Sequence, residues 1–344
     1  MRAASYIRRR GFVARACALL IACSLLALLI CLCVGSADYS LGDAVDVLLA
    51  RLLGREADKT AELVLLGIRL PRTLLAYVVG AALAVSGVLM QGVFRNPMAE
   101  PGLLGVSSGA ALGAALAMLA ELEESLFGLS AVSVCAFVGG TLAVLLVMFA
   151  AQAGRGGTTA LLLCGVAVSS FLSALLSGIL SIYNEKMESV YMWTMGSFAT
   201  ANFRKLALVT ICLIPGFVLS MCLSRDLNAI SSDADARLLG VDTRRVRLAC
   251  LLLSTLMTAA AVSVSGVIGF VGLTAPHVVR RLTGADHRSL LPLSALTGGL
   301  FLLAADTLSR TLFAPAEIPV GVTTSLVGGP LFLALIRKHR GGRS

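Results

Sequence analysis

The sequence has few charged residues. Asp, Glu, Lys and Arg together make up 14% of its 344 residues, whereas about a quarter is usual in a soluble domain. Apolar runs of about 18 residues or more, each long enough to span a bilayer, recur along the chain. The weak alternating segments of about ten residues that a membrane β-barrel needs are absent. The composition therefore excludes an ordinary soluble domain and predicts an all-α, polytopic membrane protein.

Several chemistry-bearing residue types are scarce. The chain has three histidines and one tryptophan, and neither His277 nor His287 has a carboxylate at ligand spacing, so we predict no metal site and no cofactor. Without a basic stripe interleaved with aromatic residues, nucleic-acid binding is not expected. The sequence has no Gly-Lys dipeptide, which excludes a Walker A loop. The nine cysteines lie in apolar stretches without a C-x-x-C pair, and are expected to be small buried residues rather than metal or redox groups.

Hydropathy predicts about ten transmembrane helices. The first follows an arginine-rich N-terminus, and its length favours a membrane helix over a signal peptide. The stretch 248–282 is too long for one span at 1.5 Å per residue, and Gly266, Gly269, Gly272 and Pro276 offer places to break it. The expected helices cover 16–34, 65–92, 103–120, 126–151, 160–182, 206–223, 248–267, 272–282, 290–314 and 320–336.

An even number of spans places both termini on one side of the membrane. With this topology about two thirds of the 28 lysines and arginines fall in the loops on that side, which the positive-inside rule assigns to the cytoplasm. The net charge of +9 then reflects topology and contact with anionic membrane lipid. We expect a single transmembrane domain over 1–344, with an external loop at 35–62 and a long cytoplasmic loop at 224–247.

A polar turn at 95–101 interrupts the apolar pattern between the second and third spans. Gly105, Gly109 and Gly113 follow it at four-residue spacing, and such a face lets another helix approach closely. The residues themselves predict a cytoplasmic turn followed by a tightly packed helix.

Two predicted spans carry hydroxyl groups. Ser169, Ser173 and Ser177 share one face of the fifth span, and Thr323 and Thr324 open the tenth. Hydroxyls in membrane helices often bond their own backbone or join helices. The alternative is that they form a mildly polar wall along the path of a solute.

The loop 224–247 combines charges with a small apolar segment. Ala236, Leu238, Leu239 and Gly240 are typical of a short helix that ends at a glycine. Apolar residues among charges on an exposed loop favour docking into the groove of a partner, although a plain linker remains an alternative.

Three basic residues are expected at the external ends of spans. Arg69 and Arg72 precede the second span and Arg310 ends the ninth, where arginines commonly anchor helices at the membrane surface. Asp306 lies four residues before Arg310, so the two can pair along the helix. This spacing favours a satisfied ion pair over a proton relay.

Six stretches, taken in order, resemble a known family: 69–113, which contains "RNPMAEPGLLGVSSGAALG", 158–170, 192–198, which reads "MWTMGSF", 234–247, 264–292 and 319–336. They are similar to the permease subunits of the bacterial ABC importers for iron–siderophore, haem and cobalamin, the large ten-helix class. The resemblance covers nearly the whole chain after the first span. It implies a permease that binds no nucleotide and is not an enzyme.

The resemblance also implies a homodimer around one central path. The fifth and tenth helices line this path, which makes the five hydroxyl residues named above lining candidates. It assigns the cytoplasmic gate to Asn96, Pro97, Met98, Thr158 and Thr159.

The resemblance implies two further kinds of partner. Two copies of a cytoplasmic ATPase subunit are expected to seat on the Ala236–Gly240 segment. A periplasmic or lipid-anchored solute-binding protein is expected to place acidic residues on Arg69, Arg72 and Arg310. The protein would then lie in the bacterial cytoplasmic membrane and move a bulky iron chelate, with haem and cobalamin as alternative cargoes.

Two other classes fit the sequence less well. An ion-driven secondary transporter needs intramembrane acids or unwound half-helices around a midplane site, and Asp306 is the only acid placed well inside a predicted span. An intramembrane enzyme needs a constellation such as Ser and His at depth. His277 and His287 are instead expected towards the cytoplasmic face, away from Asp306.

Overall fold

The computed structural model is almost entirely helical. It describes residues 2–35, 39–53, 58–122, 125–126, 129–153, 157–232, 236 and 238–340. Each of the ten predicted spans corresponds to a helix: α1 (Arg2–Cys33), α4 (Leu70–Phe94), α5 (Val106–Leu119), α6 (Ala131–Ala153), α7 (Thr158–Ile182), α9 (Phe203–Cys222), α11 (Thr243–Ser265), α12 (Val271–Thr283), α13 (His287–Thr311) and α14 (Val320–Arg340).

Short elements connect these helices. They are α2 (Leu41–Leu53), α3 (Lys59–Glu62), the π-helix η1 (Leu63–Arg69), the 3₁₀ helices η2 (Pro101–Leu104) and η3 (Asn184–Lys186), α8 (Met187–Thr194), α10 (Ser224–Ser231) and an antiparallel pair of strands, β1 (Ser125–Leu126) and β2 (Leu129–Ser130). The external segment 35–62, expected as a loop, thus contains helices. Ala44 and Val47 of α2 pack against Leu32 at the end of α1.

Within the described residues, seven helices are long and apolar enough to cross a membrane, and α5 and the apolar part of α14 are shorter. This confirms a polytopic helical membrane protein. The predicted break in 248–282 is confirmed too, because α11 ends at Ser265 and α12 begins at Val271. Gly266 makes this break possible with a φ of 70°, a conformation that is strained for other residues. Pro276 lies inside α12 and does not end it.

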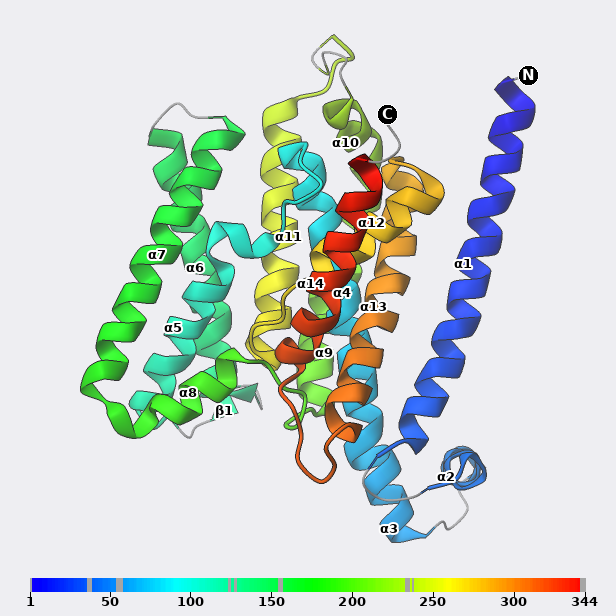
Figure 1. Ribbon diagram of the computed structural model, residues 1–344, viewed down its shortest axis with the longest axis vertical. Coiled ribbons are helices and arrows are strands. Elements are labelled where there is room, and N and C mark those ends of the chain that lie inside the picture. Colours follow the sequence, from blue (N-terminus) through cyan, green and yellow to red (C-terminus); the bar gives the residue numbers. More distant parts are fainter. Residues whose placement is uncertain are drawn as a thin grey trace.

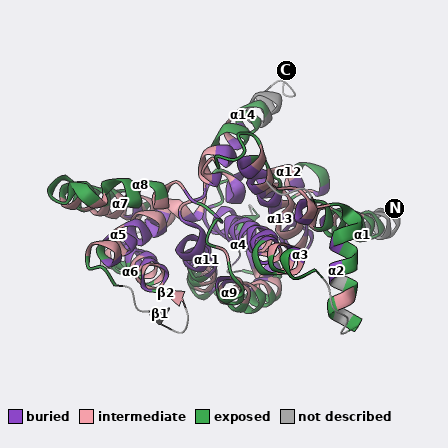
Figure 2. Ribbon diagram, turned by 90° about the horizontal axis from the view of Figure 1, so that it is seen from below, coloured by how far each residue is buried: buried purple, intermediate pink, exposed green. Residues whose placement is uncertain are grey.

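The helices form a bundle with a buried centre and exposed flanks. Helix α1 begins and α14 ends at the same end of the molecule, the upper end in Figure 1. In the most apolar 18 residues of the span that contains α4, 83% of the residues are buried, whereas in those of α7 only 6% are. Figure 2 shows α4 surrounded by α9, α11, α12 and α13, while α7 and α1 stand on opposite flanks. The chain therefore builds its core around α4 and leaves α7 largely uncovered.

The glycines after the polar turn pack as predicted. A Cβ atom at Gly109 would collide with the carbonyl oxygen of Gly139, and one at Gly113 would collide with that of Cys135. Both contacts join α5 to α6, so these backbones touch directly, as in other small-residue helix pairs.

The cysteines are less buried than expected. All nine are free, and Cys31, Cys212 and Cys250 are buried, but Cys23 and Cys222 are exposed. The exposed pair lies on helices long and apolar enough to cross a membrane. An apolar stretch predicts residence in the bilayer, but it does not say which face of the helix meets protein.

Candidate translocation path, gate and coupling surface

The polar turn lies at the upper end of α4. Arg95 ends that helix in the left-handed conformation, with a φ of 48°. Asn96 Oδ1 then accepts a hydrogen bond of 2.9 Å from the backbone N–H of Met98, which closes a short Asx-type turn. Asn96, Pro97 and Met98 are exposed. The predicted gate segment is therefore an ordered and accessible turn.

The chain then passes from the turn back into the bundle towards α5 (Figure 1). Ala99 is buried, and burial raises the pKa of the neighbouring Glu100 carboxyl. Helix η2 follows and lies directly on α7, because a Cβ atom at Gly165 would collide with the carbonyl oxygen of Leu103. The turn and α7 are thus mechanically joined through η2.

The start and one face of α7 hold five of the predicted site residues. Thr158 is half-buried and Thr159 is exposed at the upper end of the helix. Ser169 is half-buried opposite Gly105, and Ser173 Oγ donates a hydrogen bond of 3.4 Å to Ser108 Oγ on α5. Ser177 is exposed.

The predicted hydroxyls of α14 are not on an open surface. Thr323 and Thr324 are both buried. Thr323 shares a hydrogen bond of 2.7 Å with Ser309 Oγ of α13, and Thr324 donates one of 3.0 Å to the carbonyl of Gly321. In this conformation both side chains are therefore engaged inside the chain and are not open to its surface. Ser325 is the exposed hydroxyl of this turn.

Backbone hydrogen bonds tie the end of α8 to α11 and α14. The N–H of Ser197 donates to the carbonyl of Ser265 at 2.8 Å, and the N–H of Val320 donates to the carbonyl of Gly196 at 3.0 Å. Gly196 has a φ of 77°, so this junction needs glycine. In the sequence this glycine is visible only as part of "MWTMGSF", because Ser265 and Val320, between which it lies, are far away along the chain.

The loop 224–247 differs from its prediction. Its helix is α10, and the helix expected over 236–240 is wrong where the chain is described, because 238–240 form a turn in which Gly240 has a φ of 76°. Ala236 is buried, whereas Leu238 and Leu239 are 85% and 64% exposed. Residues 233–235 and 237 of this segment lie outside the described residues. Two leucines therefore protrude from the upper end of the molecule.

Helix α10 is fastened to the start of α13. Asn228 Oδ1 accepts a hydrogen bond of 2.9 Å from the backbone N–H of His287 and lies 2.6 Å from its Nδ1. The amide nitrogen of Asn228 donates to Asp286 at 2.8 Å. His287 therefore helps to hold α10 against α13. The described residues contain no group of three His, Cys, Asp or Glu placed to hold a metal ion.

Two of the predicted external arginines cap α1. Arg69 Nη1 donates hydrogen bonds to the carbonyls of Leu32 at 3.1 Å and Cys33 at 2.6 Å. Arg310 donates to the carbonyl of Cys31. The last carbonyls of a helix lack partners within the helix and carry partial negative charge. The two guanidinium groups therefore stabilise the lower end of α1.

The third arginine forms a buried ion-pair network. Arg72 pairs with Asp306 at 2.9 Å and with Glu317 at 2.9 Å, while Arg310 lies 3.9 Å from Asp306. Asp306 is indeed a satisfied partner, although Arg72 approaches it more closely than Arg310 does. Arg69, Arg72 and Arg310 are all buried. In this conformation their burial leaves little of the guanidinium groups open to the acids of a binding protein, the role that the resemblance predicted for them.

The model of the FecCD transport family matches residues 21–338 of this chain. The chain belongs to that family. It is 44% identical over 325 residues to the haemin transport system permease protein HmuU of Yersinia pestis, with 93% of this chain and 96% of that protein covered. It is 40% identical over 313 residues to the molybdate import system permease protein MolB of Haemophilus influenzae, covering 90% and 91%.

A solved structure shares the fold. It is described as an inward-facing conformation of a metal-chelate type ABC transporter, and it matches with a TM-score of 0.82 and 34% identity over 94% of this chain and 99% of that one. As a FecCD family member, the chain is a membrane-spanning permease subunit of an ABC importer and not an enzyme. Such a permease works with an ATPase and a solute-binding protein.

Proposed function

We propose that two copies of this permease form a homodimer and that α7 of each copy lines the path between them. The observation that carries the proposal is the exposure of α7, a 25-residue apolar helix in which Gly165 is the one residue fully buried within its own chain. A second copy related by a two-fold axis would cover part of this face. Ser169, Ser173 and Ser177 then give the path a mildly polar wall, together with Ser325.

The gate in this proposal consists of the turn Asn96–Met98 and the start of α7 at Thr158 and Thr159. Both are accessible at the upper end, and η2 joins them mechanically through Leu103 and Gly165. Movement of α7 would therefore move the turn. Thr323 and Thr324 support α14 from within and reach the path only if α14 moves against α13.

We place the upper end in the cytoplasm of a bacterial inner membrane, because the arginine-rich N-terminus and C-terminus lie there. Leu238 and Leu239 then form the surface on which the ATPase seats, one ATPase copy per permease. The solute-binding protein, soluble or lipid-anchored, docks at the lower end. Exposed cations there, such as Lys59 and Arg204, take the role first given to the buried arginines.

The proposed cargo is a bulky iron chelate, either an iron–siderophore or haem. The 44% identity to a haemin permease supports haem over cobalamin as the alternative to an iron–siderophore. The 40% identity to a molybdate permease shows why identity at this level does not fix the cargo.

The test of cargo is ATPase stimulation. The permease, its ATPase and its binding protein are reconstituted in liposomes, and the binding protein is loaded in turn with an iron–siderophore, haemin, cobalamin or molybdate. We expect stimulation by an iron chelate. If cobalamin or molybdate alone stimulates, the cargo proposal fails while the importer assignment stands.

The gate is tested by cross-linking across the two-fold axis. In a background without the native cysteines, Thr158→Cys is expected to form a disulfide-linked dimer that blocks uptake. A disulfide requires Cα atoms within about 7 Å, so only residues near the axis can form one. The yield is expected to change with the nucleotide state of the ATPase, and is measured on non-reducing gels.

The matched control is Ala114→Cys, which is fully buried in α5 and is expected to stay monomeric. Removal of Cys23 and Cys222 matters most for the background, because these two are exposed. A monomeric Thr158→Cys in every nucleotide state would contradict the placement of α7 at the axis.

A further inference from the structure

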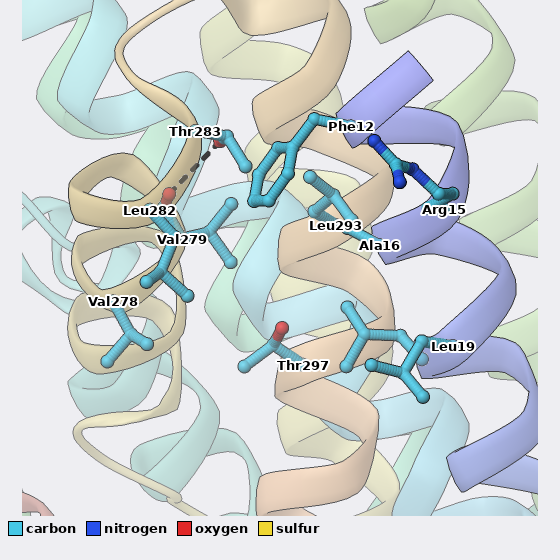
Figure 3. A pocket seen from close by; sticks show the side chains of 11 residues that line it. Phe12, Arg15, Ala16, Leu19, Val278, Val279, Leu282, Thr283, Leu293 and Thr297 are labelled. Carbon is cyan, nitrogen blue, oxygen red and sulfur yellow. Dashed lines mark hydrogen bonds between the residues drawn. The ribbon is translucent and has the colours of Figure 1, made fainter. Parts of the chain in front are cut away.

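A groove runs between α1 and the pair α12 and α13 near the upper end (Figure 3). It encloses about 570 Å³. Its walls are almost entirely apolar, and Phe12, Leu19, Val278 and Leu293 are among the lining residues. The hydroxyl of Thr283, one of two threonines in the wall, donates to the carbonyl of Val279 at 3.0 Å. The groove thus offers a ligand apolar surface and few polar partners.

The groove lies beside helices that cross the membrane. Helix α1 is a candidate span from Gly11 and α13 is one from His287. Helix α1 stands on the flank opposite α7 (Figures 1 and 2), so the proposed dimer would leave it free. Because α1 and α13 are long and apolar enough to cross a membrane, the groove between them is open to lipid, and its apolar lining suits an acyl chain.

The mouth of the groove is basic. Arg15 is exposed there, its Nε donates to the carbonyl of Gly11 at 3.2 Å, and its two Nη atoms have no partner among the described residues. Figure 3 shows its guanidinium at the same level as Phe12, above Leu19. Helix α12 carries Arg280 and Arg281 in its last turn, at the same end of the molecule.

Other charges near this mouth do not cancel the positive excess. The acid that follows α12 is Asp286, whose carboxylate accepts hydrogen bonds from the backbone N–H of Arg288 at 3.1 Å and from Asn228 at 2.8 Å. It is therefore engaged at the start of α13.

Polar contacts hold α1 mainly by its lower half. Tyr77 donates a hydrogen bond of 2.9 Å to Ser24, and Arg69 and Arg310 cap the last turn. The upper half, from Phe12 to Leu19, faces α12 and α13 across the groove. Val13, Ala16, Cys17 and Leu20 already pack against the core of the bundle, and an occupant of the groove would extend this packing.

We propose that the groove binds one anionic phospholipid, with an acyl chain between α1 and α13 and the phosphate at Arg15. Basic clusters beside membrane helices attract anionic headgroups, and the apolar walls complement the chain. With the orientation proposed above, the lipid belongs to the cytoplasmic leaflet.

The probe is a pair of synthetic lipids of equal chain length, phosphatidylglycerol and phosphatidylcholine, added in equal amounts to the full-length protein in mild detergent. Native mass spectrometry measures the ratio in which the two are retained. We expect wild type to favour phosphatidylglycerol and Arg15→Gln to lower that preference about fivefold, the effect of one basic residue near an anionic surface. The matched control is Arg225→Gln, an exposed arginine at the same end, which should retain the preference.

The chain site is tested by filling the groove. Ala16 lines the groove whereas Ala18 is exposed elsewhere on α1, so Ala16→Trp should lose retained lipid and Ala18→Trp should not. Thr297→Phe fills the groove from α13 and replaces Ala16→Trp if that variant is not produced.

Equal lipid preference in Arg15→Gln and wild type would overturn the headgroup assignment, and equal retention in Ala16→Trp and Ala18→Trp would overturn the chain site. A protein chain that co-purifies with wild type and is lost in Ala16→Trp would overturn the lipid as occupant. Because the readout is lipid retention, none of these results bears on the importer function.

Discussion

Replacement of Leu238 and Leu239 with aspartate is expected to abolish cargo uptake while the permease still inserts into the membrane. Both leucines protrude from the upper end. Burial of a leucine side chain stabilises a contact by about 1.5–3 kcal/mol, so loss of both would weaken ATPase docking by about a hundredfold or more. Uptake in reconstituted liposomes and co-purification of the ATPase measure the effect.

The matched control is Ser232→Asp, which adds a negative charge to an exposed position of the same loop without removing an apolar side chain. It is expected to retain uptake and ATPase binding. If the variant with aspartate at both Leu238 and Leu239 still co-purified with the ATPase and showed stimulated hydrolysis, the docking surface would lie elsewhere at this end, with α10 as the next candidate.

Asp306→Ala is expected to lower the stability of the permease strongly. The substitution leaves Arg72 with only Glu317, and it removes the one acid that pairs with Arg310 within the described part of the chain. Removal of one partner from a buried ion pair typically lowers the free energy of unfolding by about 3–5 kcal/mol, because the other charge stays buried. The midpoint of thermal unfolding in detergent, followed by size-exclusion chromatography after heating, measures the loss.

Glu317→Ala provides the comparison for this substitution, because it removes the other carboxylate that holds Arg72. The side chain of Glu317 is 40% exposed, whereas that of Asp306 is 1% exposed, so water replaces much of what Glu317 contributes. We expect the unfolding midpoint of Glu317→Ala to stay closer to wild type. If both variants lost the same stability, burial of Asp306 would not be the deciding factor.

The lower end of the molecule acquires a structural role from these contacts. Arg69 and Arg310 satisfy the last carbonyls of α1, and Arg72 joins α4 to α13 and to Glu317. These contacts fix the lower ends of α1, α4 and α13 to one another.

Much of the fold follows from local patterns in the sequence. Apolar runs identify the spans because a membrane helix must satisfy its backbone internally and present apolar side chains to lipid. Gly109 and Gly113 predicted a close helix pair, and α6 is the helix they contact. The glycines at 266–272 predicted the break between α11 and α12. Each of these features depends on residues close together in the chain.

The direction of individual side chains did not follow from such patterns. The local sequence around Arg69 is compatible with three roles: an anchor at the membrane surface, a contact for a docking protein, or a cap on a neighbouring helix. Thr323 and Thr324 were predicted to line the path, but both are buried, and Thr323 shares a hydrogen bond with Ser309 of α13. For Arg69 and Thr323 the partner lies on another helix, which the local sequence does not reveal.

The sequence by itself determined the class of protein, the approximate positions of the helices that correspond to the ten predicted spans, its small-residue contacts and its resemblance to importer permeases, because these depend on composition and local spacing. Only the tertiary structure decided that Arg69, Arg72 and Arg310 are buried, that Leu238 and Leu239 rather than Ala236 protrude, and that α7 is left uncovered. The physical reason is that exposure and hydrogen bonding depend on which helices pack side by side. That arrangement is set by the packing of the whole bundle around α4.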